Sequence, residues 1–468
     1  MIVFHLTISS TVSIAQAPYS LPGGSPKPSL SPPFRVIKCA YWPSFDGFPL
    51  TSIDTSYFTH LYYAFLLPDP NTYNLAITAL DEEMLPLFVS TLRAKKPLVK
   101  TILSIGGAGN DPKVFSAIVN ANSTRSTFIE SAIEVARTYG FDGLDLDWEF
   151  PLNQQDMINL GILYKEWWKA LKIEAKATGR TRLLLSSAVY YASTVFKYSP
   201  SPKYPGESIR KYVDWVSPMC FDFYGSWDMV TGQPAALYDP TSNISTSYGI
   251  HSWIDAGVPP NKIVMGLPLY GHSWKLKDPL VHGVGAPTTG AGGPNNGNMI
   301  YSAIVDFNRG QNATVVYDGK TVSTYSYVGD MWIGYDDGRS VTKKVEFARV
   351  NGLRGYFFWA LGQDKDWSLS NQEDTKTERL NASNCHKSAS HLPSVLPFEP
   401  APPGEHIGSS SSAAQTQGVF TLQDVGSKLQ ILTVNMGEVK TRLGDIDTRL
   451  GAIDTRLGVV ETKVQSLR

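Results

Sequence analysis

Hydrophobic and polar positions follow two alternating periods between residues 34 and 370. Short apolar runs that end in Gly, Asp or Pro are separated by segments of helical period, such as residues 82–94, 125–139 and 155–178. This alternation is typical of βα units, in which helices cover a parallel sheet. A stretch of about 330 residues suits an α/β fold, a (β/α)8 TIM barrel with an insertion, since the plain barrel needs about 250.

One connection in the second half of this stretch, residues 273–329, is too long for a simple βα unit. It is rich in Gly, Asn, Thr and Val and contains two strand-like segments, 313–317 and 321–327. The glycine cluster at 283–293 lacks the Lys-Ser/Thr ending and the following helix that a phosphate-binding loop requires, which favours a surface loop.

The pattern changes again after the barrel. Residues 371–418 contain Pro-rich and Ser-rich stretches and are typical of a linker. Apolar residues then recur in steps of three and four from Leu422 to Leu467, which predicts a coiled-coil helix over 419–468. Leu at one core position and β-branched residues at the other favour a homo-oligomer of three or four chains. Four glycines each cost the helix about 1 kcal/mol, so a lone, partly frayed helix remains the alternative.

The most informative segment is 141–151, which reads Phe-Asp-Gly-Leu-Asp-Leu-Asp-Trp-Glu-Phe-Pro. Asp145, Asp147 and Glu149 alternate with large apolar residues, so a strand would project three carboxyl groups from one face. Mutual repulsion and partial burial should keep a proton on such a group, and Glu149 at the strand end is the best placed to use it. The alternatives are a structural acid or a calcium site, but calcium loops place their oxygens on glycine-containing turns.

Composition excludes several classes of function. A formal net charge of -1 and a pI near 6.7 provide no basic field for nucleic acid. The 8 histidines and the three cysteines show no ligand spacing, so no metal site is predicted. No segment after the N-terminus is long and apolar enough to predict a membrane span. Aromatic residues make up 12% of the chain, and flat rings are the usual stacking platforms for sugars.

The 142–149 run matches the Asp-x-x-Asp-x-Asp-x-Glu signature of the family 18 glycoside hydrolases, the chitinases and their relatives. Seven further segments resemble the other barrel strands of that family in order: 38–43, 60–65, 101–107, 183–191, 215–225, 263–271 and 354–361. The resemblance spans 34–367. It implies that 273–329 is a small α+β insertion domain between barrel strands seven and eight, which would wall one side of a substrate groove.

The resemblance implies hydrolysis of β-1,4-linked N-acetylglucosamine in chitin or chito-oligosaccharides, with retention and without a cofactor. Glu149 would be the general acid and base, while the 2-acetamido oxygen of the substrate attacks the anomeric carbon. Asp147 would orient the acetamido N–H and stabilise its developing positive charge. Asp145 would share a proton with Asp147, and Asp142 would support the hydrogen bonding of the strand.

The same resemblance implies a substrate pocket. Trp359 would form its hydrophobic floor, and Trp227 an aromatic platform on the leaving-group side. Gly107 ends a Ser-x-Gly-Gly segment that lets the backbone approach the substrate closely. The other implied pocket residues are Tyr41, Phe65, Met219, Asp222 and Tyr270.

Three positions depart from the family pattern. Phe221 stands where a tyrosine is common, which removes a hydroxyl expected to bond the acetamido oxygen; Tyr224 or a water would have to replace it. Ala108 follows Gly107 where many relatives have a tryptophan. His272 stands where arginine is usual. These departures leave two alternatives open, a carbohydrate-binding lectin on the same barrel and an endo-acting enzyme on N-glycan cores.

The N-terminus predicts export. Residues 1–17 are mildly apolar and end in Ala-Gln-Ala, a small-x-small pattern typical of signal-peptide cleavage, although no basic residues precede the apolar part. Residues 18–33 form a Pro/Ser-rich segment before the barrel. Sequons at Asn122, Asn243, Asn312 and Asn381 are compatible with a secretory route. The expected localisation is extracellular.

Overall fold

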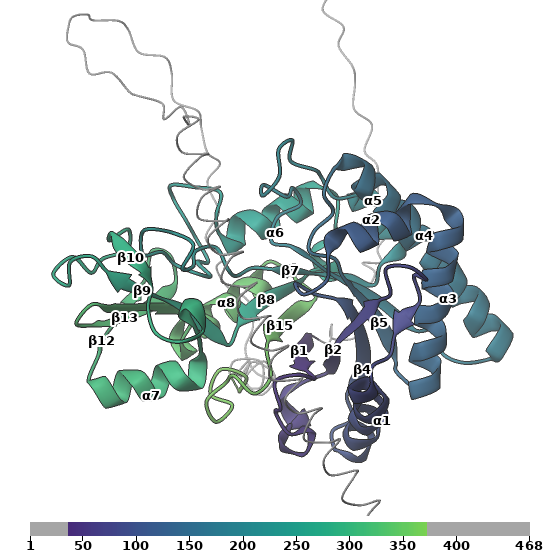
Figure 1. Ribbon diagram of the computed structural model, residues 1–468, viewed down its shortest axis with the longest axis horizontal. Helices are drawn as coiled ribbons and strands as arrows, with labels where there is room; N and C mark the ends of the chain where they lie inside the picture. Colours follow the sequence, from purple (N-terminus) through teal and green to yellow (C-terminus); the bar gives the residue numbers. More distant parts are fainter. Residues whose placement is uncertain (1–35, 372–468) are drawn as a thin grey trace, which may run out of the picture. The chain divides into compact units, whose positions relative to one another are not determined.

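The structure is a computed structural model that describes residues 36–371 (Figure 1). The predicted signal peptide (1–17), the segment 18–33, the coiled coil (419–468) and all but the first residue of the linker (371–418) lie outside the described residues. Within the described range, no helix combines the length and the apolarity needed to cross a bilayer.

Eight parallel strands form the centre of the molecule. In spatial order they are β7 (Trp215–Met219), β6 (Leu184–Tyr190), β5 (Gly143–Asp147), β4 (Lys100–Gly106), β2 (His60–Pro68), β1 (Ile37–Pro43), β15 (Gly355–Trp359) and β8 (Val264–Pro268). A parallel bridge between Val216 and Ile263 joins the two end strands. The sheet therefore closes, which confirms the predicted eight-stranded barrel.

Helices cover the outside of the barrel (Figure 1). They are α1 (Ala79–Ala94), α2 (Pro112–Asn120), α3 (Asn122–Tyr139), α4 (Gln154–Thr178), α5 (Gly206–Tyr212), α6 (Thr246–Asp255) and α8 (Gly338–Val350). The predicted helical segments 82–94 and 125–139 each begin three residues late, at the first turns of α1 and α3. Thr78 caps α1 through a capping box with Asp81, and left-handed Gly179 follows the end of α4.

Short elements complete the barrel loops. A two-residue strand, β3 (Leu75–Ala76), pairs with the end of β2. Single 3-10 turns occur at η1 (Leu50–Ser52), η2 (Thr55–Tyr57), η3 (Pro260–Lys262) and η4 (Asn295–Gly297).

The insertion is a second, antiparallel sheet. It contains β9 (Tyr270–Leu276), β10 (Thr288–Ala291), β11 (Asn298–Ile300), β12 (Thr314–Asp318), β13 (Ser323–Val328) and β14 (Met331–Tyr335), with one helix, α7 (Tyr301–Gln311). Strands β10, β9, β14, β13 and β12 are neighbours in that order, and β11 also pairs with β9. The sheet lies between the seventh and eighth barrel strands, as the sequence predicts.

The boundaries of this insertion differ from the predicted range 273–329. Strand β9 begins at Tyr270, two residues after barrel strand β8 ends, so the predicted strand 263–271 is in fact two strands in two sheets. Strand β14 ends at Tyr335 and pairs with β9. Apolar residues continue through the first junction, and only the pairing partner changes, so the hydrophobic pattern does not place that boundary. At the second junction, the sequence prediction ended at 329 and left out strand β14.

A buried ion pair fastens the end of the insertion to the barrel. Asp336 follows β14, and Lys344 lies on α8; their side chains are each 1% exposed. Lys344 Nζ donates to Asp336 Oδ1 at 2.6 Å and also to the carbonyl oxygen of Ala235. Ser340 Oγ donates to the same carboxylate at 2.7 Å. The buried charges are therefore paired and hydrogen-bonded, as buried charges must be to be tolerated.

Lys344→Met should lower the free energy of unfolding by about 3 to 5 kcal/mol, because it leaves the Asp336 carboxylate buried without its cation. The matched control is Lys343→Met, which removes an exposed lysine 3.0 Å from Glu346 and should cost less than about 1 kcal/mol. Urea unfolding of the two variants measures the difference. Equal losses would show that the buried pair does not hold the insertion in place.

Candidate active site

The residues of β5 point alternately into and out of the barrel, with the acidic ones inside. Leu144, Leu146 and Trp148 belong to the cluster between the strands and the outer helices. Asp145 and Asp147 face the opposite way and are buried. The predicted period-two strand therefore places its carboxyl groups inside the barrel, at the carboxyl end of the strands, where barrel enzymes carry their functional groups.

Asp145 is held by hydroxyl groups from three other barrel strands, β1, β4 and β6. Its carboxylate accepts hydrogen bonds from Tyr41 Oη at 3.0 Å, Ser104 Oγ at 2.8 Å and Ser186 Oγ at 2.7 Å. Complete burial raises the pKa of Asp145, and these hydrogen bonds oppose the rise. Among the described residues, none of its hydrogen bonds goes to Asp147, so the shared proton stays a prediction.

Asp147 is buried with one oxygen, Oδ1, that has no hydrogen-bond partner. Burial, then the charges of Glu149 and Asp145, raise the pKa of Asp147 well above its usual range. The end of the neighbouring strand β4 packs closely against the backbone of Asp147. A Cβ atom on Gly106 would lie 2.1 Å from the Asp147 carbonyl oxygen, so this close packing requires glycine. An unpaired buried oxygen at the mouth of the barrel is suited to bind a donor group from a ligand.

Glu149 follows β5 and carries the second perturbed carboxyl group. Burial raises the pKa of Glu149 to about 7, the charge of Asp222 adds to the rise, and Lys197 opposes it. A carboxyl group that titrates near neutral pH can give and take a proton during one reaction cycle. The sequence prediction that Glu149 is the proton carrier thus has a physical basis in the structure.

Glu149 lies where two cavities meet. The smaller has a volume of about 350 Å³ and the larger about 720 Å³. Glu149, Met219, Phe221 and Asp222 line both. The two cavities together form a path past the Glu149 carboxyl group, with space for a ligand on either side of it.

The smaller cavity has an aromatic floor. The rings of Phe65 and Trp359 stack with centroids 5.5 Å apart, and Tyr41 lies 5.6 Å from Trp359. Tyr270 and Asp147 also line this cavity, so the structure brings together the predicted pocket residues from five different strands. Phe45 and Leu67 line it as well, and sequence reasoning missed both.

Gly107 packs against a pocket side chain. It lines neither cavity, whereas Gly106 and Gly109 line the smaller one. A Cβ on Gly107 would lie 2.6 Å from the Phe65 ring, and its φ is +85°. Gly107 therefore makes room for Phe65, and the close approach of its backbone to a substrate stays a prediction.

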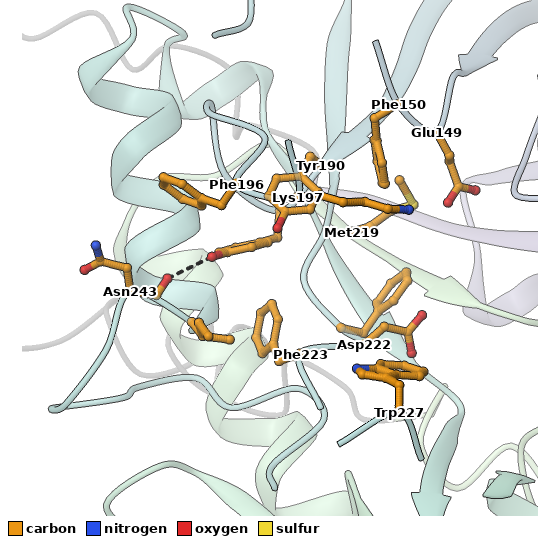
Figure 2. Close-up of a pocket in the computed structure, with 13 residues that line it drawn as sticks. Glu149, Phe150, Tyr190, Phe196, Lys197, Met219, Asp222, Phe223, Trp227 and Asn243 are labelled. Atoms are coloured by element: carbon orange, nitrogen blue, oxygen red, sulfur yellow. Dashed lines mark hydrogen bonds between the residues drawn. The ribbon is translucent and has the colours of Figure 1, made fainter. Parts of the chain in front are cut away.

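The larger cavity is lined mainly by aromatic side chains on the loops after β6 and β7 (Figure 2). Trp227 is 61% exposed there, as a stacking platform would be. Phe150, Tyr190, Phe196 and Phe223 were not predicted; aromatic residues at or just after the carboxyl ends of β5, β6 and β7 are the sequence signal that could have identified them. In Figure 2 the Lys197 amine points toward the Glu149 carboxyl group.

Two of the three family departures change contacts in these cavities. Phe221 packs near Tyr270 and Phe357, with ring centroids 6.2 and 6.0 Å away, and brings no hydroxyl. Tyr224, which the sequence suggested as a substitute, lines neither cavity and packs against Gly232 instead. His272 lies 2.7 Å from Asp222 Oδ1, and its ring meets that of Trp227 at 5.2 Å.

Asp142 lies at the opposite end of the barrel. Its carboxylate accepts from Lys100 Nζ at 2.9 Å and from the Thr101 backbone N–H at 3.0 Å. These bonds tie β5 to β4, as predicted, and take no part in the cavities. Within residues 36–371, no group of three or more His, Cys, Asp and Glu side chains is arranged to hold a metal ion.

The raised pKa of Glu149 makes stability depend on pH. Because the folded pKa lies above the usual value of 4.5, ionising Glu149 destabilises the fold, beginning above pH 4.5 and completely above pH 7. Glu149→Gln should therefore raise the free energy of unfolding at pH 8 by about 1 to 3 kcal/mol and change it little at pH 4.5. Glu130→Gln, an exposed change on α3, should show no such pH dependence in urea titrations. An equal effect of Glu149→Gln at both pH values would contradict the assignment.

The sequence and the fold of this chain are similar to those of known proteins. Residues 38–364 match the family described as glycosyl hydrolases family 18. The class V chitinase CHIT5 of Lotus japonicus is 54% identical over 337 residues, which cover 72% of this chain and 85% of that protein. The structure of a class V chitinase from Nicotiana tobaccum in complex with NAG4 matches with a TM-score of 0.70 at 40% identity, over 72% of this chain and 97% of that one. The chitinase-like agglutinin RobpsCRA from Robinia pseudoacacia matches with a TM-score of 0.66 at 40% identity, over 72% and 98%. The chain belongs to family 18 of the glycosyl hydrolases.

Proposed function

We propose that the protein is a chitinase that hydrolyses β-1,4-linked N-acetylglucosamine in chitin and chito-oligosaccharides. The observation that carries the proposal is the pairing of Glu149, whose pKa lies near 7, with the unpartnered Asp147 Oδ1 beside an aromatic floor. These are the groups that substrate-assisted cleavage of an N-acetylated sugar needs. The relationship to class V chitinases supports the same substrate.

In the proposed reaction, Glu149 donates its proton to the glycosidic oxygen as the bond to the anomeric carbon breaks. The acetamido oxygen of the substrate attacks that carbon, which gives an oxazolinium ion and retention after water adds. Glu149, now ionised, takes the proton of the incoming water. A group titrating near 7 performs both steps with little energetic mismatch at neutral pH.

Asp147 acts on the acetamido group. Its free Oδ1 accepts the N–H, and this hydrogen bond strengthens as positive charge grows on the nitrogen. Asp147 stabilises that charge best when ionised, and transfer of its proton toward Asp145 provides the ionised form. The stacked Phe65 and Trp359 rings support the sugar, with Trp227 under the leaving group.

Two other functions compete with the chitinase function. A lectin is the second candidate, because a chitinase-like agglutinin matches at 40% identity. The presence of a buried, proton-holding Glu149 favours catalysis over binding alone. Action on N-glycan cores is the third, and the long cavity pair with its aromatic lining favours chito-oligosaccharides.

We also propose export and self-association, which rest on sequence patterns outside the described residues. The small-x-small motif at residues 15–17 supports cleavage of a signal peptide and an extracellular protein. The heptad pattern of residues 422–467 supports a trimer or tetramer. Several catalytic domains on one stalk would bind insoluble chitin with higher avidity than a single domain.

Glu149→Gln should reduce the kcat for chitotetraose hydrolysis by about 10²- to 10⁴-fold, the usual contribution of general acid–base catalysis. Glu130→Gln is the control for a neutralised exposed carboxyl and should match the wild type. Product analysis by chromatography provides the rates. Binding of chitotetraose without wild-type turnover would establish the lectin, and release of N-glycans in place of chito-oligosaccharide cleavage would establish the glycan enzyme.

Light scattering on secreted protein should give three or four times the chain mass, and a version stopped at Gly418 should give one chain mass, because the predicted coiled coil holds the chains together. Identical monomeric masses would refute the assembly.

N-terminal sequencing of the same secreted material should begin after Ala17. An intact Met1 would refute the signal peptide.

A further inference from the structure

Helix α4 carries its acids and its lysines on different faces. Glu166 and Glu174 turn toward α3, where each is bound by both arms of an arginine: Arg125 at 2.6 and 3.0 Å, and Arg137 at 2.9 and 2.6 Å. The remaining acid of the helix, Asp156, is buried in its first turn. Every carboxylate of α4 is therefore either buried or already paired with a cation of the neighbouring helix.

The lysines of α4 form a row on its outer face, here called the lysine stripe: Lys165, Lys169, Lys172 and Lys176. They follow one another in steps of four, three and four residues, which places them along one side of the helix. All four are exposed, and no ion pair formed within residues 36–371 includes any of them. At about 1.5 Å per residue, the stripe spans about 16 Å.

The stripe is unfavourable for the helix by itself. Like charges three or four residues apart repel each other, and the stripe contains three such pairs in succession. The helix dipole favours a cation in the last turn, which accounts for Lys176 but not for Lys165 or Lys169, two to three turns earlier. A solvated helix face normally mixes both signs of charge. An unbroken row of one sign is instead suited to bind a ligand of the opposite sign.

The neighbouring helix α5 adds to the positive charge of this side of the barrel. Its last turn carries Arg210 and Lys211, and its one acid, Glu207, is paired with Lys211 at 2.5 Å. Tyr212 brings this turn against α4, because its ring centroid lies 5.6 Å from that of Trp168. The cations of α5 thus lie beside the helix that carries the stripe.

The stripe is separate from the catalytic cleft. Helix α4 begins at Gln154, just after Glu149, and runs along the outside of the barrel (Figure 1). Lys165 lies about 16 Å further along the helix. None of the four lysines lines either cavity. A ligand on the stripe would therefore leave the cleft open to its own substrate.

We propose that the lysine stripe binds an acidic polysaccharide, a linear polymer of uronic acid sugars with one carboxylate on each sugar. The proposal rests on the proposed function, since an exported enzyme that acts on one polysaccharide would meet others beside it. A straight row of cations is complementary in charge and in shape to such a polymer. Ile173, between the last two lysines, is 69% exposed, and it provides apolar contact to the sugar rings together with the lysine stems.

Two other polyanions fit the stripe less well. Single-stranded nucleic acids gain much of their affinity from bases that stack on open aromatic rings. The ring on this side of α4, Trp168, is covered by Lys172 Nζ at 4.4 Å and bordered by Tyr212. Anionic lipids are concentrated in the cytoplasmic leaflet of the membrane, which an exported protein does not face.

The test measures the dissociation constant for polygalacturonate by affinity electrophoresis of the full chain at low salt. The stripe variant changes all four lysines to Gln, and a second variant changes them to Arg, which keeps the charge. The control variant loses the same charge at four exposed lysines on other elements: Lys96, Lys277, Lys320 and Lys343.

The stripe variant should bind polygalacturonate about tenfold or more weakly than the wild type, because four ion pairs with the polymer are lost. The control and the Arg variant should stay within about threefold of the wild type, and about 0.5 M salt should abolish the differences. Turnover of chitotetraose should be the same in all four proteins, which shows that each variant is folded.

Equal affinities of the stripe and control variants would overturn the proposal. So would equal binding of methyl-esterified polygalacturonate, which has the same backbone without the charge. Tighter, stripe-dependent binding of single-stranded DNA or of phosphatidylserine vesicles would also overturn it, and would assign the stripe to that ligand. Failure of the proposed function would appear separately, as absence of chitotetraose hydrolysis in the wild type.

Discussion

Burial of ionisable carboxyl groups at the mouth of the barrel is the constraint on which the site depends. Removal of water makes the charged form of Asp145, Asp147 and Glu149 costly, and each pKa rises for that reason before any other. The surroundings then give the three carboxyl groups different environments. Asp145 is stabilised by three hydroxyl groups, Asp147 keeps an unpaired oxygen, and Glu149 faces open space. Strand β5 and the residues just after it thus present three carboxyl groups in three different environments.

The insertion is part of this electrostatic arrangement and not only a wall of the groove. Strand β9 follows barrel strand β8 almost directly, so Tyr270 and His272 arrive at Asp222 with little freedom of position. The buried Lys344–Asp336 pair fixes the other end of the sheet against α8. The two contacts hold the sheet at both of its junctions with the barrel, and a shift of the insertion would therefore alter the charge beside Glu149.

Two of the three departures from the family pattern fall in one region. Phe221 and His272 both lie around Asp222, on the side of the cleft that Trp227 shares. Phe221 brings no hydroxyl to the cavities, and His272 lies 2.7 Å from Asp222 Oδ1. The acid strand itself matches the family signature, so none of the departures falls among its carboxyl groups.

The sequence by itself determined the barrel, the acid strand and most of the pocket, because period-two alternation fixes which side chains face inward and motif order fixes which strand each belongs to. It missed the aromatic lining after β6, since cavity walls come from loops whose course depends on distant partners. The start of the insertion was also beyond it, because an apolar run continues unchanged as the chain passes from β8 into β9. Only the tertiary structure decided which acid lacks a partner and which histidine meets Asp222: those facts depend on distances between residues far apart in the chain, and local sequence pattern carries no information about them.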